Sequence, residues 1–326
     1  MQSILGIDVS KDTLDLVMVT SKGSFHKVIS NQPQGYQSLA KWFKSQQAGQ
    51  VHACLEATGQ YGEAVAAFLL EGGHLISVVN PARIKHYGES KLHRNKTDKA
   101  DADLIAEFCQ KEKPALWQPL SPEIKHLRAL VRRLTDQKAN LQQEINRLKS
   151  GEKDVWVIED LQIHIDYLRE RIKATEKEID ALIDQTPGLK SQHKLLTSIP
   201  GIGDHTASTL LAEIGDLSVY AGARQLAAYA GLNPQGHRSG TSVHKKTRIS
   251  KQGRSELRCC LYMPAIVAMS HNPVIKDLND RMAERGSHKM EIVVAAMRKL
   301  LHIAYGVLKN QIPFDPHYGE QFNFSS

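Results

Sequence analysis

Four carboxylates could do chemistry together although they lie far apart in the chain. Asp8 lies in the apolar segment ILGIDVSKD, Glu56 ends the apolar segment ACLE, and Asp98 and Asp101 lie in RNKTDKAD. A helix would place the last two on one face, since they differ by three positions. Carboxylates gathered at one point repel each other unless a hard cation such as Mg²⁺ or Mn²⁺ binds among them. Two such ions could activate the attacking oxygen and stabilise the leaving oxygen of a phosphodiester.

Each acid also has a plain interpretation. Asp8 alternates with Ile7 and Val9, so in a strand its side chain would point to the face opposite theirs. A charge in the middle of such an apolar strand is costly unless it is paired or binds a metal ion. Asp98 follows Thr97 and could simply cap a helix. The order of strand, strand and helix nevertheless favours one metal-binding and catalytic site, formed by Asp8, Glu56, Asp98 and Asp101.

The elements that must position these acids alternate between strand and helix. Apolar alternation predicts strands at 3–10, 13–20, 25–29, 51–58 and 75–80, and helices at 36–46 and 62–73. Residues 1–120 therefore predict an α/β domain with a mixed sheet flanked by helices. The polar stretch 85–96 is expected to be a mobile loop before a helix that begins near Asp98.

Residues 121–186 carry a different pattern. Two segments place apolar residues at 4-3 spacing, at Leu127, Val131, Leu134, Leu141, Ile145 and Leu148 and again at Leu161, Ile165, Leu168, Ile172, Ile179 and Leu182. The sequence SGEKD separates them as a turn. This spacing predicts an antiparallel helical hairpin or an oligomerising coiled coil, with two ordinary packed helices as the alternative.

Residues 187–326 are expected to be mostly helical. The segment IPGIG, before a new helical pattern, is typical of a helix-hairpin-helix motif. Gly201 and Gly203 would let backbone N–H groups meet a phosphate. A glycine-rich helix connection without a ligand is the alternative.

A basic segment follows at 231–258, with seven Arg or Lys residues against one acid, Glu256. We expect a flexible loop here, whose hydroxyls Ser239, Thr241 and Ser242 could attack a phosphodiester. The residues alone favour the alternative in which these hydroxyls and the bases only bind phosphates, and they do not choose among the three hydroxyls. The predicted nucleic-acid contacts here are Arg238, Lys245, Lys246, Arg248, Lys251 and Arg254.

Composition narrows the classes of protein. The net charge is +7, and residues 191–326 hold 16 basic and 10 acidic side chains, which indicates a polyanionic partner. No apolar run approaches the roughly 18 residues of a membrane span, so no membrane partner and no secretory signal are expected. Four cysteines without CxxC spacing indicate reduced thiols in a cytoplasmic protein without zinc. No GK[ST] loop supports ATP dependence.

Taken together, the motifs resemble a known family. GIDVSKDTLD, CLEATGQY, VVNPARIK, RNKTDKADADLIAEF, IPGIG, YAGARQLAAYAGLNPQ and RSGTSV occur in the order seen in the insertion-sequence-110 transposases, DEDD recombinases guided by a bridge RNA. The resemblance implies a RuvC-like domain of the RNase H fold at 1–120, a coiled-coil hairpin at 121–186 and a C-terminal transposase domain at 187–326.

The same resemblance implies a site and partners. The family's four acids fall on Asp8, Glu56, Asp98 and Asp101, and its catalytic serine falls on Ser239. The acids would bind Mg²⁺, and the serine would form a covalent phosphoserine link to donor or target DNA. A noncoding bridge RNA would pair with both DNAs, and a homodimer would assemble into a tetramer on nucleoid-associated DNA in the bacterial cytoplasm.

Two other functions fit the residues less completely. One is a RuvC-like metal-dependent endonuclease that cuts branched DNA with water, which would not need Ser239. The other is a non-catalytic nucleic-acid-binding scaffold, which would need none of the four acids. A scaffold would have no reason to gather carboxylates that repel each other.

Overall fold

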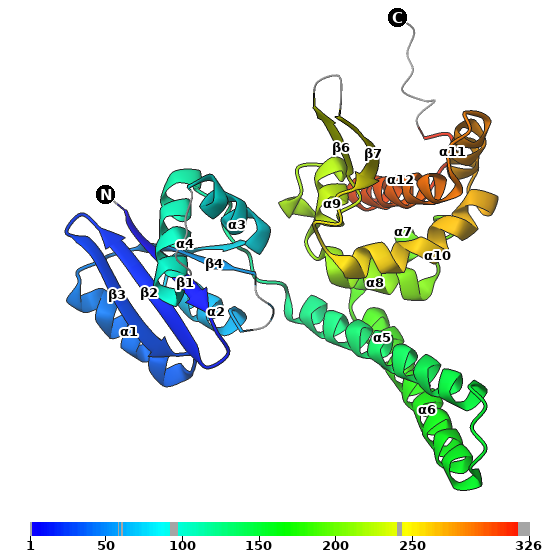
Figure 1. Ribbon diagram of the computed structural model, residues 1–326, viewed down its shortest axis with the longest axis horizontal. Coiled ribbons are helices and arrows are strands. Elements are labelled where there is room, and N and C mark those ends of the chain that lie inside the picture. The colour runs from blue at the N-terminus through cyan, green and yellow to red at the C-terminus, as the bar shows by residue number, and fades with distance from the viewer. Residues whose placement is uncertain (1, 58, 60, 92–96, 240–242, 319–326) are drawn as a thin grey trace, which may run out of the picture. The chain divides into compact units, whose positions relative to one another are not determined.

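The computed structural model describes residues 2–57, 59, 61–91, 97–239 and 243–318, with the side chains of 236–247 left out of the description. The chain divides into two compact units, Met1–Pro119 and Leu120–Ser326 (Figure 1).

The first unit contains a five-stranded mixed sheet in the order β3-β2-β1-β4-β5. Neighbours β1, β2 and β3 pair antiparallel, whereas β4 and β5 continue the sheet parallel to β1. The strands are Ser3–Val9, Thr13–Thr20, Gly23–Ser30, Val51–Glu56 and Leu75–Val79. The expected mixed α/β sheet is confirmed, and this strand order fits an RNase H-like domain.

Helices cover both faces of this sheet, as the side-chain alternation requires. On one face α1 (Pro33–Ser45) and α2 (Glu63–Glu71) bury Leu5 and Ile7 of β1. On the other face α3 (Pro81–Ser90) and α4 (Asp98–Glu112) bury a second core that includes Ile4, Val17, Cys54, Ile84 and Ile105. Asp8 follows Ile4 and Gly6 in the alternation, so it lies on the face covered by α4.

Gly6 sets how closely α4 approaches the sheet. A Cβ at this position would lie 2.1 Å from the carbonyl oxygen of Ala102 and 2.5 Å from the nitrogen of Ala106, both in the backbone of α4. Only glycine therefore allows this contact between helix and strand. As a result, the first turn of α4 lies near the end of β1 that carries Asp8.

The expectation of a mobile loop at 85–96 is wrong for its first part, because helix α3 continues to Ser90. Asn80 caps this helix by accepting a hydrogen bond of 2.9 Å from the nitrogen of Ala82, and Pro81 begins it with the backbone angle that a helix needs. Ile84 and Tyr87 then pack toward α4. Residues 92–96 lie outside the described residues.

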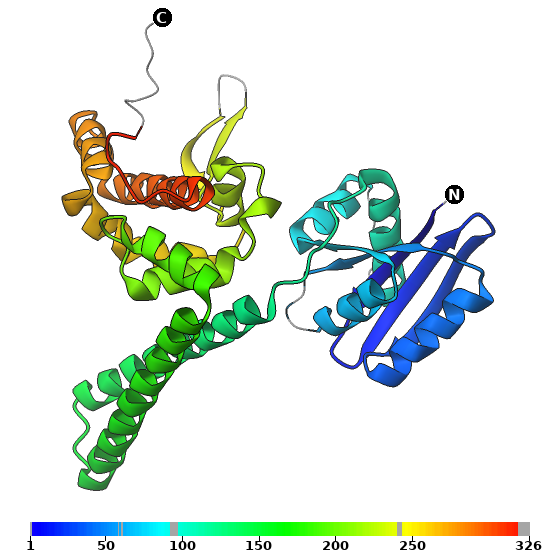
Figure 2. The same ribbon diagram turned by 180° about the vertical axis from the view of Figure 1, so that it is seen from behind.

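The second unit begins with two long helices, α5 (Pro122–Lys149) and α6 (Val155–Gln185), which lie side by side in both views (Figure 1, Figure 2). Leu127, Val131 and Leu134 of the predicted apolar seam join the buried core of the helices that follow. Lys138 lies between Leu134 and Leu141 and interrupts this seam, and its Nζ lies 2.9 Å from Glu176 Oε1. The hairpin is thus anchored by apolar packing at one end and joined by an ion pair in its middle.

Six α-helices and a β-ribbon complete the described part of this unit. The helices are α7 (Pro187–Thr197), α8 (Asp204–Ile214), α9 (Ala223–Tyr229), α10 (Ser255–His271), α11 (Pro273–Glu284) and α12 (Lys289–Asn310), with a 3₁₀ turn at Leu217–Val219. The basic segment was expected to be a flexible loop, but it forms two antiparallel strands, β6 (Pro234–Ser239) and β7 (Val243–Ile249). Among the helices described, none combines the length and the apolarity of a membrane span.

We expect the Gly6→Ala variant to lose about 3 kcal/mol or more of folding free energy, because the added methyl group meets helix backbone that cannot move aside. Chemical denaturation followed by circular dichroism measures this loss. Gly188→Ala is the matched control, since a Cβ there meets no atom within 4 Å, and its stability should be unchanged or slightly higher. Equal stability of both variants would contradict the role given to Gly6.

Candidate active site

Asp8 and Glu56 end neighbouring parallel strands on the same face of the sheet. The register pairs Gly6 with Cys54 and Ile7 with Leu55, so the next residues along, Asp8 and Glu56, lie at the same level. Cys54 is buried in the core beneath α4, and Glu56 follows it by two positions on that same face. Both acids are half-buried. The strand ends therefore present two carboxylates toward the first turn of α4.

Asp98 and Asp101 occupy that first turn. The capping role belongs to Thr97, whose hydroxyl accepts a hydrogen bond of 3.2 Å from the nitrogen of Ala100. The alternative in which Asp98 caps the helix is therefore wrong. The N-terminal end of a helix favours negative charge, which helps to hold two acids at this position.

A further acid, Asp15, joins this group and was not predicted. The antiparallel register sets Asp15 directly opposite Asp8, and His26 Nε2 lies 3.0 Å from Asp15 Oδ1. Like charges directly opposite each other on neighbouring strands destabilise a sheet, and His26 offsets part of that cost when it is protonated. The sequence signal that could have revealed Asp15 is the short turn between β1 and β2, because that turn fixes which residues of the two strands lie opposite each other.

The electrostatics of Asp8 report how close these acids are. Burial raises the pKa of Asp8 above its ordinary value of 3.8, and the charges of Asp101, Asp98 and Asp15 raise it further. A hydrogen bond from the backbone of Val9 acts in the opposite direction. The fold therefore holds several carboxylates near one another although their negative charges repel.

The chemistry of these donors fits a divalent cation. Carboxylate oxygens are the ligands that Mg²⁺ and Mn²⁺ prefer, and a cation would relieve the repulsion that raises the pKa of Asp8. Within the described ranges, no three His, Cys, Asp or Glu side chains lie close enough to share one ion. The structure brings Asp8 near Asp98 and Asp101, and the strand register sets Glu56 beside Asp8, but these side chains do not form a complete metal site.

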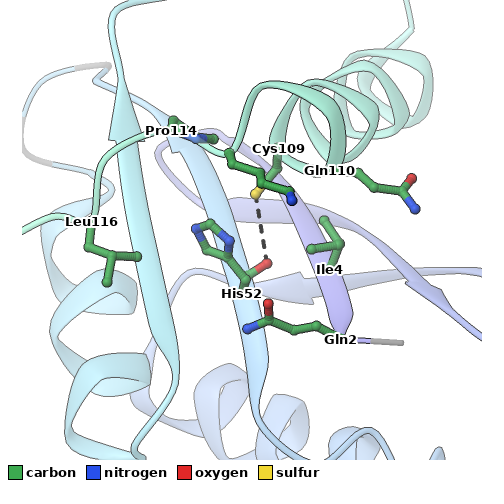
Figure 3. A pocket seen from close by; sticks show the side chains of 8 residues that line it. Gln2, Ile4, His52, Cys109, Gln110, Pro114 and Leu116 are labelled. Carbon is green, nitrogen blue, oxygen red and sulfur yellow. Dashed lines mark hydrogen bonds between the residues drawn. The ribbon is translucent and has the colours of Figure 1, made fainter.

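A cavity of about 570 Å³ lies at the other end of the same sheet (Figure 3). Its lining residues include His52, Leu116 and Cys109, and Cys109 lies far along α4 from Asp98. His52 Nε2 lies 2.9 Å from Ser77 Oγ, which in turn donates a 3.0 Å hydrogen bond to the carbonyl of Pro114. His52 and Ser77 are therefore engaged in bracing the chain, and this cavity is separate from the acids.

The two glycines of the predicted helix-hairpin-helix motif differ. Gly201 has a φ of 103°, and a Cβ there would lie 2.7 Å from the Ala268 Cβ and 2.9 Å from the Pro264 carbonyl. The close packing against α10 therefore requires a residue without a side chain at position 201. Gly203 precedes α8, and a Cβ there would meet nothing within 4 Å. Phosphate binding at these glycines stays a prediction.

The basic ribbon carries the predicted nucleophile at its far end. Ser239 is the last residue of β6 and pairs with Val243, while Thr241 and Ser242 lie outside the described residues. The side chains of Ser239, Arg238, Lys245 and Lys246 also lie outside the description. Among the remaining predicted contacts, Arg248 and Lys251 are exposed and Arg254 is half-buried.

These features define the class of the chain, an α/β domain with acids at the carboxyl ends of its inner strands and in the first turn of α4, joined to a helical unit with a basic ribbon. Two family models match it. One, described as Transposase IS116/IS110/IS902 family, matches residues 193–279, and the DEDD transposase model of IS110 matches residues 5–151.

Relatives extend the similarity over nearly the whole chain. The pilin gene-inverting proteins of Moraxella lacunata and Moraxella bovis are 37% identical over 322 residues, covering 98% of this chain and 99% of each relative. The transposase for insertion sequence element IS1111A of Coxiella burnetii is 27% identical, over 85% of this chain and 80% of that protein. This chain belongs to the IS116/IS110/IS902 family of transposases, and it is an enzyme that cuts and rejoins DNA.

A solved structure of T. thermophilus RuvC in complex with a Holliday junction substrate is also similar, at 15% identity and a TM-score of 0.26. The match covers 36% of this chain and 99% of RuvC. Because the superposition is this loose, the fold assignment rests on the strand order of the chain itself. The match to the DEDD model implies dependence on a divalent metal ion in general.

We expect the Asp8→Asn variant to be more stable than the natural protein at neutral pH without divalent cations, by up to about 1 kcal/mol since solvent screens a half-exposed group. The folded state raises the pKa of Asp8, so its ionised form costs stability as the pH rises through and above 3.8. The gain should vanish below that pH. Denaturation at a series of pH values measures it.

Asp103→Asn is the matched control, because Asp103 lies on the same helix and is not among the charges that raise the pKa of Asp8. A gain for Asp8→Asn that persists at acidic pH would show that it does not arise from charge repulsion.

Proposed function

We propose that this transposase cuts and rejoins DNA through a covalent phosphoserine at Ser239, assisted by a divalent cation, Mg²⁺ or Mn²⁺, at the acids. The observation that supports the proposal is that Asp98 and Asp101, in the first turn of α4, lie near enough to Asp8 at the carboxyl end of β1 that their charges, after burial, raise its pKa. A protein that only binds nucleic acid gains nothing from such repulsion.

Asp8, Glu56, Asp98 and Asp101 are the residues that would hold the cation. When bound, the ion supplies Lewis-acid stabilisation of the charge that develops on the phosphodiester oxygens. The chain contributes the positions of the ligands. Two come from strand ends fixed by sheet hydrogen bonds, and two come from a helix held against β1 by Gly6.

The proposed covalent step is a transesterification. The hydroxyl of Ser239 loses its proton as its oxygen bonds to phosphorus, and the bond from phosphorus to one sugar oxygen breaks, with that oxygen taking up a proton. The number of phosphate ester bonds is unchanged. A sugar hydroxyl of another strand can therefore reverse the step and rejoin DNA without an external source of energy.

Rejoining also distinguishes this function from simple cleavage. The Moraxella relatives are named for inverting a pilin gene, and an inversion needs DNA strands to be cut and joined again. An endonuclease that uses water leaves ends that need a separate enzyme for rejoining. This comparison favours the phosphoserine mechanism over the metal-dependent endonuclease, which is the second candidate.

The proposed assembly places one active site across subunits. The acids belong to the first compact unit of the chain and Ser239 belongs to the second. We propose that the two parts are brought together in a homodimer, that two dimers form a tetramer on donor and target DNA, and that a noncoding bridge RNA selects both DNAs. The order of motifs along the whole chain, RSGTSV included, supports this assignment.

We expect Ser239→Ala to abolish both strand exchange and any covalent protein–DNA adduct, since no oxygen remains to bond to phosphorus. Denaturing gel electrophoresis with labelled donor DNA, target DNA, the RNA of the element and Mg²⁺ measures the adduct. Asp8→Asn, or chelation of the cation, should reduce it by at least a hundredfold.

Thr241→Val and Ser242→Ala are the controls, because each removes a neighbouring hydroxyl, and both should still form the adduct. Cleavage that survives in Ser239→Ala but not in Asp8→Asn would instead establish the water-dependent endonuclease. Retained exchange in all of these variants would overturn the proposal altogether.

The double variant Lys245→Ala with Lys246→Ala should weaken binding to many DNA sequences alike. The fall of log affinity with log salt should also become less steep by about two, because two phosphate contacts are lost. Fluorescence anisotropy at several salt concentrations measures this slope. A loss of affinity confined to one sequence would show instead that these lysines contact base edges.

A further inference from the structure

The side chain of Asn31, just after β3, joins two segments that follow the acidic strand ends. Its Nδ2 donates one hydrogen bond of 3.0 Å to the carbonyl of Ser10 and another of 3.0 Å to the carbonyl of Tyr61. Ser10 lies two residues after Asp8, in the turn between β1 and β2. Tyr61 lies after Glu56, in the loop between β4 and α2. One amide group therefore bridges the segments that leave the two acidic strands.

The strand order makes this bridge a contact over a long distance. In the sheet, β2 and β1 lie between β3 and β4, so three strand spacings, or about 14 Å, separate the two strands. A direct hydrogen bond from the end of β3 to Tyr61 therefore requires the loop after β4 to return across the ends of β1 and β2. Gly62 follows the same path, because a Cβ there would lie 2.6 Å from Leu55 Cδ1 and 3.8 Å from Val9 Cγ2. The loop thus packs against the end of β1 as well as against its own strand.

The backbone of Asn31 adds a second bond to the turn that follows Asp8. Its nitrogen donates a hydrogen bond of 2.9 Å to the carbonyl of Asp12. Within the turn, the nitrogen of Ser10 donates a bond of 3.0 Å to the carbonyl of Thr13. The turn is therefore closed by its own hydrogen bond and is tied to Asn31 at two points, Ser10 and Asp12.

Tyr36 on α1 fixes the orientation of the amide. Its hydroxyl donates a hydrogen bond to Asn31 Oδ1, which leaves both hydrogens of Nδ2 for the two carbonyls. Gly35 allows this approach, because a Cβ there would lie 1.9 Å from the carbonyl oxygen of Ser30. The ring of Tyr36 packs on Phe68 of α2, with the ring centres 5.6 Å apart. The helices on this face of the sheet thus hold the amide in the orientation that serves both segments.

Burial gives these hydrogen bonds their importance. Asn31 is 9% exposed and Tyr36 is 7% exposed, so water does not readily replace a bond that is lost there. The side chains of Ser10, Asp12 and Tyr61 are exposed, so apolar packing by these residues does little to hold the two segments. The position of each segment therefore depends on the bonds that Asn31 makes.

We propose that Asn31 is a positioning residue for the cation site, which fixes the turn after Asp8 relative to the loop after Glu56 before a cation binds. Asn31 touches no ion in this role and acts through the backbone that carries the two acids. The proposal rests on the proposed binding of a divalent cation by the acids, and it does not depend on Ser239. Residues that only orient metal ligands typically contribute about tenfold to a hundredfold to metal affinity.

The test is the affinity of the full chain for Mn²⁺ without DNA, measured by electron paramagnetic resonance, in which the signal of free Mn²⁺ is lost on binding. Only the binding that Asp8→Asn abolishes is assigned to the cation site. Asn31→Ala should raise the Kd of this site by about tenfold, because the ligands are no longer held in place. Tyr36→Phe removes only the bond that orients the amide, so it should raise the Kd by a smaller factor.

Two control variants separate positioning from a general loss of stability. Ser3→Ala removes a buried hydrogen bond of 2.8 Å to the carbonyl of Ala48, at the opposite end of β1 from Asp8. Leu39→Ala leaves a cavity in the core that α1 covers, where Leu39 is fully buried. Both variants should lower the midpoint of thermal denaturation, and both should keep the Mn²⁺ affinity of the natural protein.

Unchanged Mn²⁺ affinity in folded Asn31→Ala and Tyr36→Phe, or an equal loss in either control, would overturn the proposal and leave the cation site standing. If Asn31→Ala does not fold, Tyr36→Phe alone decides by the same measurement. If the natural protein shows no Mn²⁺ binding that Asp8→Asn abolishes, the cation site fails and this inference fails with it. Since no DNA is present, absence of an adduct at Ser239 leaves the result intact.

Discussion

The close approach of α4 to β1 at Gly6 is the constraint on which the acidic site depends. A single methyl group at that position would meet the backbone of Ala102 and separate helix from sheet. With glycine there, the first turn of α4 lies over the end of β1, and Asp98 and Asp101 come close enough to raise the pKa of Asp8. The same packing that stabilises the fold thus creates the repulsion that a cation would relieve, an exchange of stability for function.

Much of this arrangement could be predicted from local patterns. Apolar alternation located every strand of the sheet, and the spacing of Asp98 and Asp101 placed both on one helix face. Asp15 was missed, because its place opposite Asp8 depends on the register of a hairpin rather than on its own neighbours. Helix α3 was missed because its polar composition outweighed the Asn80 cap and the proline that begins it.

The β6–β7 ribbon shows a different limit of sequence patterns. Its second strand reads VHKKTRI, where no apolar face alternates with a polar one, so periodicity gives no signal for a strand. The pairing is imposed instead by the root, where Ser250 meets Asn233 and Gly253 meets Tyr229 through the backbone. A strand held from outside in this way, with both faces polar, is suited to lie along a charged ligand rather than in a core.

Electrostatic repulsion also explains why acidic and basic side chains are distributed unevenly along the chain. Residues 1–120 carry 13 basic and 12 acidic side chains, so the unit with the acids has almost no net attraction for DNA, and its carboxylates repel phosphates locally. Affinity must therefore come from elsewhere. We propose that the 16 basic side chains of residues 191–326, in the unit that carries Ser239, supply it. The basic side chains and the four acids lie on different units, because a surface that holds carboxylates repels the phosphates that a basic surface attracts.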